Sequence, residues 1–205
     1  KRGPAPGWRL AFRTGAGRPR GFLRFWPVWE RVMWTFFPVQ PIPNAPHDVF
    51  LIHLTRYHHG KPITLPDGTQ VGKGDWICEL HLNNPRMAEY AGRGQYVRLL
   101  RDMGEDLRAL AAYLAQAPEG AAVKSLWALT LLSRGARRLG FTVRPRPVTI
   151  HAWFDRFFMM GLLALYNARG TARLREGSVY ANYPEEIWLS RGELLRRYGT
   201  AADTH

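Results

Sequence analysis

The sequence predicts an α+β fold in which a small mixed or antiparallel sheet packs with several helices, two of them aromatic-rich. The composition is that of a folded protein, because 46% of the 205 residues are hydrophobic and 13% are aromatic. Short alternating segments between glycine and proline turns predict strands at 48–57 and 76–82. Apolar residues at helical spacing predict helices at 22–37, 96–116 and 150–166.

The chain divides into three parts by composition. Residues 1–20 hold six basic residues and no acidic ones, which is typical of a basic flexible tail. Residues 21–46 contain the first aromatic amphipathic helix and then a proline-rich linker. Residues 47–199 are long enough to build one substantial core, so we expect a single α+β domain there.

The first aromatic helix allows two interpretations. Its side chains and the flanking arginines are typical of a helix in a membrane interface, with Trp26, Trp29, Trp34 and Phe37 as the contacts. The alternative is a helix that packs on the body of the domain. The chain has no run of about 18 apolar residues and no signal-like hydrophobic region at its start. We therefore expect a cytoplasmic protein, peripheral at the inner face of the cell membrane if this helix binds lipid.

The net charge of +13 predicts an anionic partner. The candidates are an anionic membrane surface, an envelope glycan precursor and nucleic acid. Nucleic acid is the weaker candidate, because the aromatic residues gather on apolar helix faces and no DNA- or RNA-binding motif is present. The single cysteine, Cys78, excludes an internal disulfide and a multi-cysteine zinc site.

The strand predicted at 76–82 carries the most specific pattern in the chain. Its alternation places Trp76, Cys78, Leu80 and Leu82 on one apolar face. The opposite face is polar, and it consists of Glu79, His81 and Asn83. A neutral His81 oriented by the carboxylate of Glu79 would serve as a general base. The alternative is a structural histidine that ties the sheet to the next helix.

A ligand pocket is predicted around this polar face. Antiparallel pairing with the strand at 48–57 would bring two further side chains to it, and Asn83 and Asn84 begin a helix at Pro85. Arg138, in a short basic helix, would add a guanidinium for a phosphate or carboxylate group. The predicted ligand-binding residues are Asn83, Asn84, Tyr57, Thr55, Thr130 and Arg138.

No cofactor and no metal site are predicted. Five histidines lie close together in the sequence, but none has the helical spacing of a paired metal ligand. They are His47, His53, His58, His59 and His81.

An ordered set of short motifs resembles the YkoP-like domain family of Gram-positive bacteria. The motifs are Thr55-Arg56-Tyr57, Leu65-Pro66-Asp67-Gly68, Gly74-Asp75, His81-Leu82-Asn83-Asn84, Arg137-Arg138-Leu139-Gly140-Phe141 and Ile187-Trp188-Leu189-Ser190-Arg191. The family also occurs fused to polysaccharide deacetylase domains, which implies a cell-envelope context. This chain has no deacetylase domain, so the resemblance does not imply deacetylation here.

Three functions are compatible with these features. The first is a peripheral membrane or envelope-associated domain that binds a phosphate- or carboxylate-bearing envelope precursor or polymer. The second is a hydrolase or transferase on an envelope substrate, with His81 as the base. The third is a basic nucleic-acid-binding protein.

Overall fold

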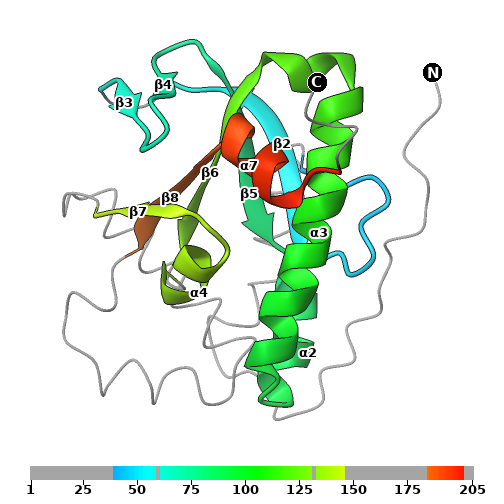
Figure 1. Ribbon diagram of the computed structural model, residues 1–205. Helices are drawn as coiled ribbons and strands as arrows, with labels where there is room; N and C mark the ends of the chain where they lie inside the picture. Colours follow the sequence, from blue (N-terminus) through cyan, green and yellow to red (C-terminus); the bar gives the residue numbers. More distant parts are fainter. Residues whose placement is uncertain (1–38, 59–60, 131–132, 146–183, 201–205) are drawn as a thin grey trace, which may run out of the picture.

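The computed structural model describes residues 39–58, 61–130, 133–145 and 184–200. These residues form a six-stranded mixed sheet, a two-stranded sheet and four α-helices, which confirms the predicted α+β class (Figure 1). No helix among them is long and apolar enough to cross a membrane. The basic tail and both predicted aromatic helices lie outside the described residues, and so do Trp26, Trp29, Trp34 and Phe37.

The elements follow one another with short connections. The strands are β1 (Gln40–Pro41), β2 (Phe50–Arg56), β3 (Ile63–Thr64), β4 (Gln70–Val71), β5 (Trp76–Leu82), β6 (Val123–Thr130), β7 (Thr142–Arg144) and β8 (Glu185–Ser190). The helices are α2 (Asn84–Gly92), α3 (Tyr96–Gln116), the 3-10 helix η2 (Pro118–Ala122), α4 (Ser133–Arg138) and α7 (Arg191–Tyr198). The predicted strands at 48–57 and 76–82 and the predicted helix at 96–116 are confirmed.

The large sheet has the order β1-β2-β5-β6-β8-β7, and β5 and β6 are its one parallel pair among the described strands. A parallel pair needs a long crossover, and α2 and α3 lie in the connection between β5 and β6. In Figure 1, α3 runs across one face of the sheet and α7 lies beside it on the same face.

The main core lies between α3 and this face of the sheet. Cys78 and Leu80 of β5 are buried in it, and Trp76 and Leu82 of the same face are half-buried. Burial raises the pKa of the Cys78 thiol, so Cys78 packs as a small hydrophobe, as predicted.

The buried stripe of α3 differs from the expected one at its N-terminal end. The sequence predicts an apolar stripe that begins at Val97, but Val97 is 84% exposed. Asp102 and Asp106 are instead fully buried in the face that meets the core. The first turns of α3 lie beside α2, beyond the end of β5, so no sheet covers Val97 there (Figure 1).

The predicted proline-rich linker is part of the domain. Strand β1 pairs with β2, where Gln40 lies opposite Ile52, and Ile42 is buried in the main core. Both oxygens of Asp106 then hold the following loop, since Oδ1 accepts the His47 N–H at 3.1 Å and Oδ2 accepts the Val49 N–H at 2.6 Å. The predicted domain start at residue 47 is therefore too late, and His47 is fixed against α3.

A smaller core lies on the other face of the sheet, beneath β3 and β4. Trp188 of β8 is fully buried there, edge-on to Tyr57 with 5.5 Å between the ring centroids. Asp67, in the turn between β3 and β4, accepts a hydrogen bond from the Ser190 hydroxyl. Ser190 also accepts the Glu193 N–H at 3.0 Å, which confirms its predicted role as the N-cap of α7.

Candidate functional site

The predicted polar face of β5 carries a carboxylate between two histidines. The pleat places Glu79 and His81 on the face opposite α3, and the antiparallel register sets His53 of β2 across from Glu79. Glu79 Oε1 lies 3.6 Å from His81 Nε2, and Glu79 Oε2 lies 3.7 Å from His53 Nδ1. The structure thus brings Glu79 and His81 together as predicted from alternation, and it adds His53.

Burial keeps this cluster uncharged. It raises the pKa of Glu79, and together with the nearby His53 it lowers the pKa of His81 to about 4. His81 keeps 33% of its side-chain surface exposed, yet its Nε2 is buried and has no hydrogen-bond partner among the described residues. A general base works best with a pKa near the operating pH, so a pKa of about 4 makes His81 a weak base.

We expect His81 to make the protein less stable in acid. An unfolded histidine takes up its proton near pH 6.5, whereas folded His81 does so only near pH 4. Between these values the unfolded state binds more protons, so the free energy of unfolding falls as the pH drops. The shift corresponds to roughly 2 kcal/mol after an allowance for the solvent that reaches the ring. Urea denaturation between pH 7.5 and 4.5 measures it.

The His81→Gln variant should lose this part of the pH dependence. Glu79 contributes with the opposite sign, because a raised carboxyl pKa favours the fold as the pH falls, but it is present in both proteins. His58→Gln, at an exposed histidine, is the matched control. Equal pH slopes for the wild type and the His81→Gln variant would show that His81 is not held neutral.

Two of the predicted ligand-binding residues share the sheet face of His81. Thr55 lies opposite Ile77, one alternation step from the His53–Glu79 pair. Tyr57 is buried in the smaller core, where burial raises its pKa, so its ring packs on Trp188 and not beside Glu79.

The predicted pocket of His81, Asn83 and Arg138 is not formed. Arg138 is exposed on α4, and the neighbouring Ala136 is buried in the main core, on the opposite face of the sheet from His81. Asn83 donates its backbone N–H to Val49 O at 2.9 Å and directly precedes α2.

The two remaining predicted ligand-binding residues are also explained by the fold. Thr130 shares the face of Leu126 and Ala128, which faces α3. Asn84 is the first residue of α2, as the Asn-Asn-Pro sequence predicted.

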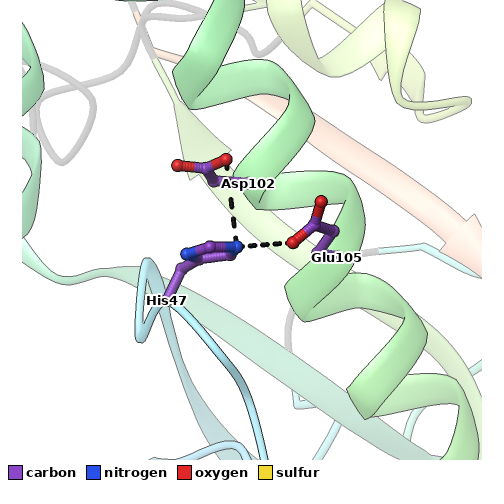
Figure 2. A group of neighbouring side chains, drawn as sticks. All are labelled: His47, Asp102 and Glu105. Carbon is purple, nitrogen blue, oxygen red and sulfur yellow. Dashed lines mark hydrogen bonds and ion pairs between the residues drawn. The ribbon is translucent and has the colours of Figure 1, made fainter.

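A second polar cluster lies where α2, α3 and the loop before β2 meet. Figure 2 shows His47 pointing from this loop toward two carboxylates of α3. His47 Nε2 lies 2.6 Å from Glu105 Oε2 and 3.8 Å from Asp102 Oδ1. The Tyr90 hydroxyl of α2 donates to Asp102 Oδ2 at 2.6 Å.

Asp102 is ionised although it is fully buried. Burial alone would raise its pKa, but the hydrogen bonds from Tyr90 and Arg101 outweigh burial and lower it. Burial, with the hydrogen bond to Asp102, raises the pKa of Tyr90 to about 12, so Tyr90 remains a donor. Arg98 adds a guanidinium 3.4 Å from Asp102 Oδ2.

A cavity of about 180 Å³ opens beside this cluster. Its lining residues are Pro46, His47, Arg86, Glu89, Tyr90, Arg93, Gln95 and Arg98. Arg86 lies 3.4 Å from Glu89, and Arg98 is paired with Asp102. Within the described ranges the Arg93 guanidinium has no hydrogen bond or ion pair.

An open depression of about 600 Å³ continues from the cavity along the start of α3. It is lined by Gly94, Gln95, Tyr96, Val97, Arg98 and Arg101, so it shares Gln95 and Arg98 with the cavity. No side chain caps the N-terminus of α3. The dipole of this 21-residue helix therefore adds partial positive charge to the arginines.

Comparison with known families matches residues 19–198 to the YkoP domain. The chain belongs to the YkoP domain family. A similar relative is the uncharacterized protein YkoP of Bacillus subtilis (strain 168), which is 28% identical over 183 residues, or 86% of this chain and 96% of the relative. No solved structure matches. The resemblance drawn from the short motifs is thus confirmed.

The arginine-lined cavity of this YkoP domain was missed by sequence reasoning. One signal was available: Asp102 and Asp106 stand four residues apart between the apolar positions of a helix, where a buried carboxylate needs partners. A second signal was the spread of Arg86, Arg93 and Arg98 around the break between two helices.

Proposed function

We propose that this YkoP domain binds a small oxyanion, a phosphate or carboxylate group, in the cavity between α2 and α3. The observation that carries the proposal is the Arg93 guanidinium, which lines a concave polar site and has no carboxylate partner among the described residues. An unpaired guanidinium in such a site attracts an anion and can bond it with two parallel N–H groups.

The charges around the cavity support an anionic ligand. Three arginines line it, against the single carboxylate of Glu89. The charge of Asp102 is already offset by Arg98 and Arg101. A ligand with one or two negative charges would complete the pairing of Arg93.

The size of the cavity favours a small group. Sites for drug-sized ligands are roughly 300–1,000 Å³, and this cavity is about 180 Å³. The rest of a larger ligand would extend into the open depression, where Tyr96 and Val97 are exposed. This arrangement suits the anionic end of an envelope precursor or polymer, and the family resemblance and the net charge of +13 support that choice.

Binding is preferred to the hydrolase alternative for a specific reason. The predicted base, His81, lines neither of the two cavities described above, and its pKa is about 4. The proposed anion site therefore moves from His81, Asn83 and Arg138 to Arg86, Arg93 and Arg98.

Calorimetric titration of the full chain with inorganic phosphate and with citrate tests the proposal. The Arg93→Gln variant should weaken binding at least about tenfold, because a hydrogen bond to a charged group contributes about 1.5–3 kcal/mol. Arg108→Gln is the control: it removes the same charge from an exposed position on α3 that does not line the cavity. A preference for phosphate over citrate, or the reverse, identifies the anion.

Equal losses for Arg93→Gln and Arg108→Gln would contradict the proposal, because they would show a general effect of net charge. Undetectable binding of both anions at low ionic strength would also contradict it.

A further inference from the structure

We infer that His47, Asp102 and Glu105 form a binding site for a divalent transition-metal cation. The site is distinct from the arginines proposed to hold the anion, and the inference does not rest on the proposed function. Three features carry it: the spacing of the donor atoms, the contacts that hold the three side chains, and the way in which Arg101 occupies the cluster.

The donor atoms have nearly the spacing that a shared ion requires. One imidazole nitrogen and one oxygen from each carboxylate lie within 4.8 Å of one another (Figure 2). Two donors at about 2.1 Å from one tetrahedral ion lie roughly 3.4 Å apart. The distances from His47 Nε2, 2.6 Å to Glu105 and 3.8 Å to Asp102, fall on either side of this value.

Neighbouring groups hold the ligands in place. The His47 backbone N–H is bonded to the buried Asp106, and the Tyr90 hydroxyl is bonded to Asp102 Oδ2. This leaves Asp102 Oδ1 facing His47. Asp102 and Glu105 are one turn apart on α3, so they project from the same side of the helix. Such outer contacts are typical of metal ligands.

Arg101 provides the positive charge that the two carboxylates need. Its Nε and a terminal nitrogen each lie 3.1 Å from Asp102 Oδ1, and Nε is 3.8 Å from Glu105 Oε1. The Arg101 side chain is 65% exposed, so it can turn into solvent with little loss of packing. A divalent ion would take its place on Asp102 Oδ1. His47 Nε2 must be unprotonated to bind the ion, so its proton moves to Nδ1 or is released.

The ligand set indicates the class of ion. Imidazole nitrogen suits zinc and iron, and carboxylate oxygen suits manganese, whereas magnesium and calcium prefer oxygen alone. We therefore expect Zn²⁺ and Mn²⁺ to bind more tightly than Mg²⁺.

Calorimetry of the full chain with ZnCl₂, MnCl₂ and MgCl₂ in phosphate-free buffer tests the site. The wild type should bind one Zn²⁺ or Mn²⁺ through this cluster. Glu105→Gln should weaken binding about tenfold or more, and Glu89→Gln, at an exposed carboxylate, should leave it unchanged. Arg101→Gln should tighten binding several-fold, because the ion no longer competes with the guanidinium.

A second readout locates the ion. Mn²⁺ should broaden the backbone amide NMR signals of His47 and Glu105 before those of His58. Thermal melts of the Glu105→Gln variant must match the wild type for the comparison to hold, and His47→Gln gives a second variant if they do not. Equal metal affinity of Glu105→Gln and Glu89→Gln, or no affinity in either the wild type or Arg101→Gln, would overturn the inference.

Discussion

Replacing Trp188 with alanine is expected to lower the free energy of unfolding by about 4 kcal/mol. Trp188 is fully buried, and its ring packs edge-on against Tyr57 and at 6.0 Å from Trp127. The truncation would leave a cavity beneath β3 and β4 that these rigid aromatic neighbours cannot fill. Equilibrium urea denaturation followed by circular dichroism measures the loss.

The matched control is Trp76→Ala on β5. Trp76 is half-buried, and the guanidinium of Arg56 lies 4.5 Å from its ring centroid. Its truncation leaves no closed cavity, so we expect a loss of about 1–2 kcal/mol. Equal losses for the two tryptophans would show that the smaller core contributes no more to stability than a half-buried surface contact.

The Asp106→Ala variant should lose about 3 kcal/mol of unfolding free energy. Both carboxylate oxygens of Asp106 accept backbone N–H groups, from His47 at 3.1 Å and from Val49 at 2.6 Å. Without them two donors beneath the main core lose their partner, and each unsatisfied group costs about 1–3 kcal/mol. Urea denaturation gives the stability, and hydrogen exchange of the Val49 amide shows whether the loop is released from α3.

Asp106→Asn should fall between the wild type and Asp106→Ala, because an amide oxygen accepts only one of the two N–H groups in the same geometry. Glu89→Ala, at an exposed carboxylate on α2, should change the stability by no more than about 0.5 kcal/mol. If Asp106→Ala were as stable as Glu89→Ala, the loop would not depend on Asp106, and the position of His47 would need another explanation.

Local patterns predicted the elements of this fold well. The alternation in β5 gave the correct buried face for Cys78 and Leu80, and the spacing of Ser190 and Glu193 gave the start of α7. These features depend on residues within a few positions of one another, so a single segment is enough to predict them.

The candidate site was harder to predict because it depends on pairing across the chain. His53 joins Glu79 only through the register of β2 and β5, and Arg138 is separated from His81 only because α4 packs on the other sheet face. Asp106 is buried because it bonds the backbone of Val49, 57 positions away in the sequence. The periodicity of one helix carries no information on such a partner, so α3 was predicted to have a continuous apolar stripe.

A phosphate titration followed by amide and arginine side-chain NMR signals tests the central claim most directly. The structure predicts saturable shifts that share one dissociation constant at Arg93, Gln95 and Arg98, with no matching change at Arg108. Shifts centred on His81 and Arg138, or shifts that grow linearly and equally at all exposed arginines, would contradict an anion site between α2 and α3.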